Sequence, residues 1–460
     1  MDISSSDDDE RQSTTEASAP PDGGYGWVCC AAVCFINANT WGLNTSYGVF
    51  LAYYLANNVF PGANPMHYAF IGGLSISCAF LVSPIATTMV RLCGTKTAMM
   101  VGVVIEAASL IAASFASKTY QLFLTQGAMF GIGMGFLFVP SAGIVPQWFT
   151  TKRSLAAGIS TSGSGFGGLL YSFATGAMIQ SLGLSWTFRI LGIVSFVVNC
   201  VCTLLIKDRN SALGSKPQAF ELRFMKRPEY LLLVAYGWFT LLGYIVVIFS
   251  LASYANFIGL GASQAALVSA LANLGQAIGR PAIGFFSDRT GRLNMGIFAS
   301  FLSAAASFAI WINSKSLGVL IFFAIFGGAV SGAFWAVITP ITAEVTGLKD
   351  VPSALSLLWL LLIAPTMFSE AVALQIVEST GNYLGAHILT GCMFTAAMVC
   401  MLLLRGWKLG ECGEVLRRTG NEAGEEYDSF KVEQSEDLMA ECRKMGREKM
   451  FAHTFKSGRV

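Results

Sequence analysis

Long runs of apolar residues, separated by short polar turns, make up most of the chain. A helix needs ~20 mostly apolar residues to cross a bilayer, whereas a strand of a membrane barrel needs only ~9–11. The runs have the length of helices, which satisfy their own backbone hydrogen bonds inside lipid. We therefore predict an all-α membrane protein with twelve transmembrane helices, at residues 27–55, 67–90, 97–116, 119–145, 155–180, 186–206, 229–258, 262–287, 294–313, 317–343, 353–378 and 383–404.

The spans fall into two groups of six around a polar, basic segment at residues 207–228. Two pseudo-symmetric bundles with a substrate site between them are typical of secondary transporters. A weak internal repeat supports this arrangement, because charged turns follow both the second and the eighth span. We expect these turns to latch neighbouring helix ends and so to act in gating. The gating residues are Arg91, Gly94, Asp288, Arg289, Gly291 and Arg292.

The predicted division of the chain follows from these spans. It consists of a disordered tail (1–26), a first bundle (27–206), a central loop (207–228), a second bundle (229–405) and a C-terminal tail (406–460) with a helix at 435–450. Lysines and arginines gather on the side of the central loop, whereas the opposite loops hold only Lys118 and Lys315. Positively charged loops face the cytosol, so both termini are predicted to be cytosolic. We expect the plasma membrane, with a vacuolar or other internal membrane as the alternative.

Composition supports a membrane protein and excludes several functions. The chain is 54% hydrophobic and 12% charged, with a mean hydropathy of +0.59, whereas a soluble domain carries ~25% charged residues. No Cys/His cluster has metal-ligand spacing, and no nucleophile constellation or basic stripe with aromatics is visible. We therefore expect no enzyme activity, metal, cofactor or nucleic-acid partner. The expected partners are the lipid bilayer and a small organic substrate, and the sequence does not determine an accessory subunit.

One arginine, Arg280, interrupts the otherwise uncharged segment at residues 262–287. A charge at that depth costs ~2.5–3.5 kcal/mol on insertion scales, so it usually faces a bundle interior or a watery cavity. Pro281 follows directly and favours a kink. Arg280 is interpreted as a substrate or coupling residue, and the alternative is a structural contact with a neighbouring helix.

Further polar and aromatic residues on inner spans are candidates to orient a ligand. In the first span, Asn37 and Asn44 share one face, together with Trp41, at i, i+4 and i+7. The alternatives are hydrogen bonds between helices for the polar groups and packing for the aromatic ones. The predicted substrate-binding residues are Arg280, Gln276, Asn273, Asn37, Asn44, Thr45, Tyr47, Tyr236 and Trp335.

Two carboxylates inside spans are candidates for proton coupling, because burial raises a carboxyl pKa. They are Glu370 in the outer half of the eleventh span and Glu106 near the middle of the third. The alternative for Glu106 is a hydrogen bond between helices, and for Glu370 a solvated position near the outer mouth.

The residues Pro21-Asp22-Gly23-Gly24-Tyr25-Gly26-Trp27 precede the first span. This run resembles the signature of the monocarboxylate transporter family of the major facilitator superfamily, and the chain is most similar to the fungal branch. The turn Asp288–Arg292 is similar to the superfamily's acid-base-glycine-base loop, of which Arg91–Lys96 is a degenerate copy. The resemblance covers residues 20–405 and implies two six-helix bundles.

Two positions depart from the lactate-carrying members of that family. The resemblance implies a substrate- and proton-binding lysine in the first span and an aspartate one turn before the span-eight arginine. Thr45 and Gln276 occupy these positions. Gln276 can hydrogen-bond Arg280 but cannot titrate, so lactate-type symport is not the favoured function.

The sequence thus predicts a secondary transporter that moves a small organic molecule by alternating access. Export of a fungal secondary metabolite is favoured, and uptake of a monocarboxylate, riboflavin or a similar nutrient is the alternative. Coupling to protons is left open. From another class, a non-transporting nutrient sensor would usually carry a longer structured cytosolic extension.

Overall fold

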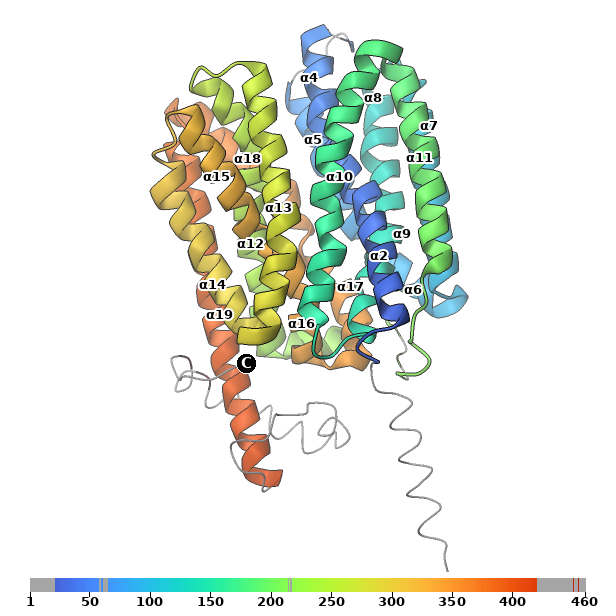
Figure 1. Ribbon diagram of the computed structural model, residues 1–460, viewed down its shortest axis with the longest axis vertical. Coiled ribbons are helices and arrows are strands. Elements are labelled where there is room, and N and C mark those ends of the chain that lie inside the picture. Colours follow the sequence, from blue (N-terminus) through green and yellow to red (C-terminus); the bar gives the residue numbers. More distant parts are fainter. Residues whose placement is uncertain are drawn as a thin grey trace, which may run out of the picture.

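The structure is a computed structural model that describes residues 21–57, 59–60, 65–213, 215, 217–419, 450 and 454. Two groups of helices stand side by side with roughly parallel axes (Figure 1). The prediction of an all-α protein is confirmed. The predicted disordered tail lies outside the described residues up to position 20, and so does the predicted helix at 435–450 except for Met450.

The first group contains the helical segments before the central loop. They are α2 (Tyr25–Asn37), η1 (Ala38–Gly42), α3 (Leu43–Thr45), α4 (Tyr47–Asn57), α5 (Pro65–Leu81), α6 (Ser83–Cys93), α7 (Thr95–Ala113), α8 (Thr119–Leu122), η2 (Phe123–Met129), α9 (Phe130–Ala142), η3 (Val145–Gln147), α10 (Arg153–Leu182) and α11 (Leu184–Leu205).

The second group follows the central loop, which contains the short η4 (Leu222–Lys226). Its segments are α12 (Pro228–Phe257), α13 (Ala262–Thr290), α14 (Arg292–Ala305), η5 (Ala306–Trp311), α15 (Leu317–Ser331), α16 (Ala333–Thr346), η6 (Leu348–Asp350), α17 (Val351–Leu361), α18 (Ile363–Thr380) and α19 (Leu384–Thr419). The boundaries follow the predicted spans closely except at the end. There α19 continues past residue 405, so the predicted tail begins in a helix.

Ten helical segments are long and apolar enough to cross a membrane within the described part of the chain. α10 and α13 are not among them, although they have 30 and 29 residues. Both carry many Gly and Ser residues, and α13 also carries Arg280. These two helices face each other in the middle of the molecule (Figure 1). The Gly and Ser residues and Arg280 account for their lower hydropathy, and several of these residues lie in the contact between the two helices.

Glycines allow α10 and α13 to approach backbone to backbone. A Cβ atom on Gly158 would overlap the carbonyl oxygen of Arg280, and one on Gly165 would lie 2.7 Å from the backbone nitrogen of Ala277. Small residues at helix interfaces permit this proximity in membrane proteins. The contact brings the middle of α10 to the turn of α13 that contains Arg280.

The first span is irregular in its centre. Between α2 and α3 the five residues of η1 form a wide π-type turn, a feature that often occurs at functional sites. Gly42 in this turn packs against the backbone of Gly167 in α10. The irregular turn lies at the level of Arg280 and carries Trp41 toward the second group.

Candidate functional site

A cavity lies between the two groups of helices, at the level of η1 and of Arg280. It has about 50 Å³ of free volume, which is room for a few waters because one water needs ~10–15 Å³ on this measure. The residues lining it are Asn37, Trp41, Asn44, Thr45, Ile76, Phe80, Phe138, Thr161, Ser164, Leu241, Tyr244, Ile245, Ile248, Phe249, Asn273, Gln276, Arg280, Trp335 and Thr366.

Arg280 is buried and donates hydrogen bonds to both groups of helices. Toward α10, Nη1 donates to the carbonyl oxygen of Thr161 at 2.6 Å and to the hydroxyl of Ser164. Toward its own group, Nη2 donates to Gln276 Oε1 at 2.5 Å and to the Tyr244 hydroxyl at 3.3 Å. All four acceptors are neutral. Nε of Arg280 is buried without a hydrogen-bond partner among the described residues.

Gln276 forms the hydrogen bond with Arg280 that the sequence predicts. It accepts from Arg280 one helical turn later and from the Tyr244 hydroxyl at 2.6 Å, and its amide lies 3.4 Å from Asn273 Oδ1. No ion pair within the described residues involves Arg280. Its positive charge therefore lies in a buried polar site without a carboxylate partner, where an anionic or strongly accepting group would bind favourably.

Seven of the nine predicted substrate-binding residues line the cavity: Asn37, Asn44, Thr45, Asn273, Gln276, Arg280 and Trp335. The predicted shared face of Asn37, Trp41 and Asn44 is confirmed. Asn37 donates to the carbonyl oxygen of Ser160 at 2.9 Å and Asn44 to the Ser75 hydroxyl at 2.6 Å, so both also join helices. Lining and helix-helix bonding, posed as alternatives, occur together.

Tyr47 and Tyr236 do not line this cavity. The Tyr47 hydroxyl donates to the carbonyl oxygen of Tyr68 at 2.9 Å inside the first group. Tyr236 is buried against Phe334 within the second group. On α12 the aromatic residue that lines the cavity is Tyr244, two helical turns after Tyr236.

The two candidate proton carriers lie away from the cavity lining. Glu106 is buried in α7 and accepts a hydrogen bond of 3.0 Å from Asn199 in α11. Glu370 in α18 is partly exposed and accepts from the Ser250 hydroxyl of α12 at 3.0 Å. Both carboxylates therefore contact a polar group of a neighbouring helix in the same group.

Thr161 and Ser164 were missed by sequence reasoning, although both contact Arg280. They lie on α10 three residues apart and thus on one face of the helix. The predicted substrate-binding residues include none from the fifth span, at residues 155–180. A polar pair at that spacing within a span was the available signal.

An aromatic cluster joins the two groups beside the cavity. The Trp41 ring lies 5.1 Å from that of Trp335, and Phe138 and Phe80 lie 5.2 Å and 5.3 Å from Trp359. Trp41, Phe80 and Phe138 belong to the first group, and Trp335 and Trp359 to the second. Such pairs contribute ~0.5–1.5 kcal/mol each beyond burial, so the cluster stabilises contact between the groups.

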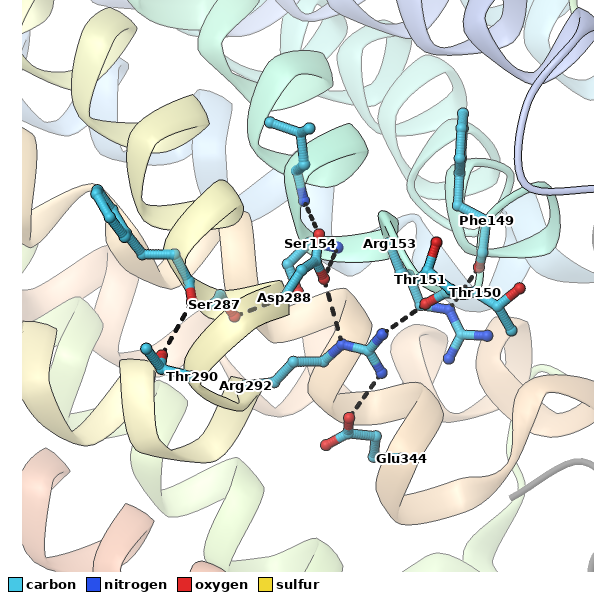
Figure 2. A network of polar contacts seen from close by, with 12 residues as sticks. Phe149, Thr150, Thr151, Arg153, Ser154, Ser287, Asp288, Thr290, Arg292 and Glu344 are labelled. Atoms are coloured by element: carbon cyan, nitrogen blue, oxygen red, sulfur yellow. Dashed lines mark hydrogen bonds and ion pairs between the residues drawn. The ribbon is translucent and has the colours of Figure 1, made fainter. Parts of the chain in front are cut away.

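The turn after α13 connects the groups at one end of the molecule, here called the gate end (Figure 2). Asp288 accepts hydrogen bonds from the backbone nitrogens of Ser154 and Leu155 at 2.9 and 2.8 Å, and so caps the start of α10. Arg292 donates to the carbonyl oxygen of Thr150 at 2.9 Å and pairs with Glu344 at 2.6 Å. A carboxylate at a helix N-terminus is favourable because it meets unpaired N–H groups.

Other members of the predicted gating turns have different positions. Arg289 is exposed and lies over the ring of Phe285 at 4.1 Å, and within the described residues no hydrogen bond or ion pair joins it to the first group. Gly94 and Gly291 have φ of 85° and 99°, which lets the chain reverse direction between helices. Arg91 is exposed, and within the described residues no hydrogen bond or ion pair joins it to the second group. On the helix of Arg91, α6, a contact with the second group is made by the Ser83 hydroxyl, which donates to the carbonyl oxygen of Ser356 at 2.9 Å.

A family model described as Major Facilitator Superfamily matches residues 29–262 and 239–409. The chain belongs to the Major Facilitator Superfamily. The predicted superfamily is thereby confirmed, and the protein is a multi-pass membrane protein of a transporter family.

Several fungal proteins are similar to this facilitator over most of its length. The probable transporter MCH2 of Saccharomyces cerevisiae is 30% identical over 394 residues, which are 84% of this chain and 83% of that protein. The uncharacterized transporter ESBP6 of the same yeast is 35% identical over 84% of this chain and 60% of its own. The agnestins efflux protein AgnL12 of Paecilomyces divaricatus is 25% identical over 79% and 83%.

Solved structures of other facilitators share the fold. The proton:xylose symporter XylE superposes with a TM-score of 0.69 at 13% identity, over 82% of this chain and 95% of that one. FucP in the outward conformation gives a TM-score of 0.65 at 14% identity, over 83% and 99%.

Proposed function

We propose that this facilitator is a secondary transporter of the monocarboxylate-transporter-like type. Twelve spans, α10 and α13 included, would form two six-helix bundles and move a small organic molecule by alternating access. The observation that carries the proposal is Arg280, a buried arginine held by neutral groups from both groups of helices. A substrate that binds its guanidinium contacts both halves at once, and so can bias their arrangement.

We further propose that the gate end faces the cytosol, together with both termini. Support comes from the lysines and arginines, which gather in the loops at this end. The bonds of Asp288 and Arg292 to the α10 start would then close the cytosolic side. The plasma membrane is the proposed location, and an internal membrane is the alternative.

Within the cavity, Arg280 would attract an anionic or strongly hydrogen-bonding group of the substrate. Gln276, Asn273, Asn37, Asn44 and Thr45 would orient it, and Trp335 would contact its apolar part. Gln276 does not titrate, so a proton would not be carried at that position of α13. Of the remaining candidates, Glu370 and Glu106 lie outside the lining, which favours transport without proton coupling through them.

Export is favoured over uptake as the direction of transport. The similarity to a protein named as an efflux protein supports this proposal. The test compares metabolites in the medium of cells that lack the protein, carry it or carry Arg280→Ala. Compounds that leave the cells only with the unchanged protein would support export.

The same cells distinguish the alternatives. Labelled lactate and riboflavin serve as fixed probes, and uptake of either that depends on the protein would support nutrient import. No change in any exported compound or in either uptake would contradict transport and favour a sensor.

A further inference from the structure

We propose that Asp22, in the turn before α2, is a positioning residue of the gate and acts on Arg292 through one peptide group. The inference rests on the gating role proposed above for Arg292. The run Pro21–Trp27 lies outside the predicted spans, and the inference gives it a role in positioning the gate.

Asp22 holds the loop between α9 and α10. Its Oδ1 accepts from the backbone nitrogen of Thr150 at 2.8 Å, and its Oδ2 accepts from the nitrogen and the hydroxyl of Thr151 at 3.0 and 2.6 Å. The backbone nitrogen of Asp22 donates to the carbonyl oxygen of Trp148 at 3.0 Å. One short turn thus makes hydrogen bonds with a loop that is far away in the sequence.

The backbone and the neighbouring aromatics fix this position. Asp22 has a φ of 54°, an uncommon conformation for a residue other than glycine. Gly26 packs against Trp148, where an added Cβ atom would lie 2.9 Å from the Trp148 Cβ. The Trp27 ring lies 4.8 Å from that of Phe149, edge to face. The turn before α2 therefore packs closely against the loop between α9 and α10.

Arg292 binds the same loop from the opposite side. Arg292 Nη2 donates to the carbonyl oxygen of Thr150 at 2.9 Å, and Figure 2 shows the two residues side by side. The carbonyl of Thr150 and the N–H of Thr151 belong to one peptide group. That peptide group lies between the carboxylate of Asp22, which accepts its hydrogen, and the guanidinium of Arg292, which donates to its oxygen.

The carboxylate of Asp22 and the guanidinium of Arg292 each strengthen the hydrogen bond that the other makes with this peptide group. A carboxylate at the N–H polarises the carbonyl and makes it a better acceptor for the guanidinium. Partial burial raises the pKa of Asp22, but bonds from the Thr151 hydroxyl and from backbone N–H groups outweigh it and hold this pKa below its usual value. Asp22 therefore stays charged at neutral pH. Arg292 Nε also lies 3.8 Å from Asp288 Oδ1. Loss of the Asp22 charge should therefore loosen Arg292 and, through this ion pair, the contact of Asp288 with α10.

Hydrogen exchange at single amides tests this chain of contacts in the purified full-length protein, without any substrate. In Asp22→Asn, the amides of Ser154 and Leu155 should exchange about 5-fold faster or more, the lower bound of typical coupling between sites. Those two amides bond to Asp288 of the other group and do not touch Asp22. In Arg292→Gln, the amide of Thr151, which is the N–H of the shared peptide group and bonds to Asp22, should exchange faster in turn.

Tyr25→Phe is the matched control, because it removes a bond to the carbonyl oxygen of Leu205 from the same turn and leaves Asp22 in place. Its Ser154 and Leu155 amides should exchange as in the unchanged protein. Exchange that is unchanged at Ser154 and Leu155 in Asp22→Asn would overturn the inference. So would an equal acceleration in remote helices such as α19, which would indicate general destabilisation. If Asp22→Asn does not fold, Thr151→Val removes only the hydroxyl bond and must show a smaller change of the same kind.

The outcome is independent of transport itself. Coupling between Asp22 and Arg292 without any transported compound would leave the positioning of Arg292 by Asp22 standing and contradict the proposed function, including the gating role. Transport without coupling between Asp22 and Arg292 would contradict this inference and leave the proposed function standing.

Discussion

Arg280 combines full burial with a coordination that leaves one donor unused. Four neutral acceptors bind its terminal nitrogens, whereas Nε has no partner among the described residues. A buried donor without a partner costs ~1–3 kcal/mol, so an acceptor that reached Nε would bind favourably. Because the cavity also exposes Asn273 and Asn44, an anionic substrate would find further donors nearby.

The Tyr244 hydroxyl links Arg280 to Gln276, since it lies 3.3 Å from one and 2.6 Å from the other. Tyr244→Phe should therefore weaken substrate binding by ~0.5–1.5 kcal/mol, the usual net value of a hydrogen bond. The change is measured as the concentration that half-saturates transport of an exported compound. Tyr254→Phe on the same helix removes a bond to the Ser314 carbonyl outside the cavity and is the matched control. A larger effect of Tyr254→Phe would contradict this assignment.

Glu370 and Glu106 bear on the coupling ion. Because neither lines the cavity, transport should depend only weakly on pH across the physiological range. Flux into vesicles at a series of pH values, with and without a pH gradient, measures this dependence. A steep dependence that Glu370→Gln abolishes and Glu106→Gln preserves would instead show that Glu370 carries protons.

At the scale of helices, α10 and α13 form the most extensive contact between the two halves. Their glycines let the backbones touch, and the residues facing the cavity are brought together by that contact. Alternating access requires this surface to change its packing, so it must tolerate movement without large side chains in the way. The two helices therefore serve as the surface along which the halves are proposed to move.

Gly165→Ala should lower the free energy of unfolding by ~1–3 kcal/mol, the usual cost of overpacking. The added methyl would lie 2.7 Å from backbone atoms of Asn273 and Ala277, which cannot move as a side chain could. Thermal or denaturant unfolding in detergent measures the loss. Gly176→Ala in the same helix is the control, because its nearest neighbour is the Val49 side chain at 3.9 Å. Equal stability of the two variants would show that α13 yields at this point.

The bounds of the helices were easier to predict from the sequence than the residues of each helix that reach the cavity. Apolar runs determine the position and length of membrane helices, so the predicted bounds agree well with α2 to α18. Tyr47 and Tyr236 were placed in the cavity because they lie on inner spans, yet one helix face decides which residue reaches it. Thr161 and Ser164 were missed because a polar pair three residues apart within a span does not by itself show which residue of another helix it contacts. The extension of α19 was missed because a polar, charged helix beyond the membrane lacks an apolar run.

At the scale of the whole molecule, the two groups of helices enclose a cavity that holds only a few waters. A transported molecule of any size therefore requires the groups to separate. Bonds between the groups at the gate end are made by Asp288 and Arg292, and near the cavity by Arg280. In the proposed transport cycle the bonds at the gate end and at the cavity would break and re-form, which would link the proposed substrate binding at Arg280 to the state of the gate.

The central claim is that Arg280 binds the substrate of a transporter, and flux in vesicles tests it most directly. The compound identified by the metabolite comparison is measured with the unchanged protein, Arg280→Ala and Arg289→Ala. Arg289 is the control, since it is an exposed arginine of the same helix. We predict that Arg280→Ala lowers flux by ~10-fold or more, the loss expected from a charge-assisted bond of ~1.5–3 kcal/mol. Arg289→Ala should transport normally. Flux of Arg280→Ala equal to that of the unchanged protein would contradict the account.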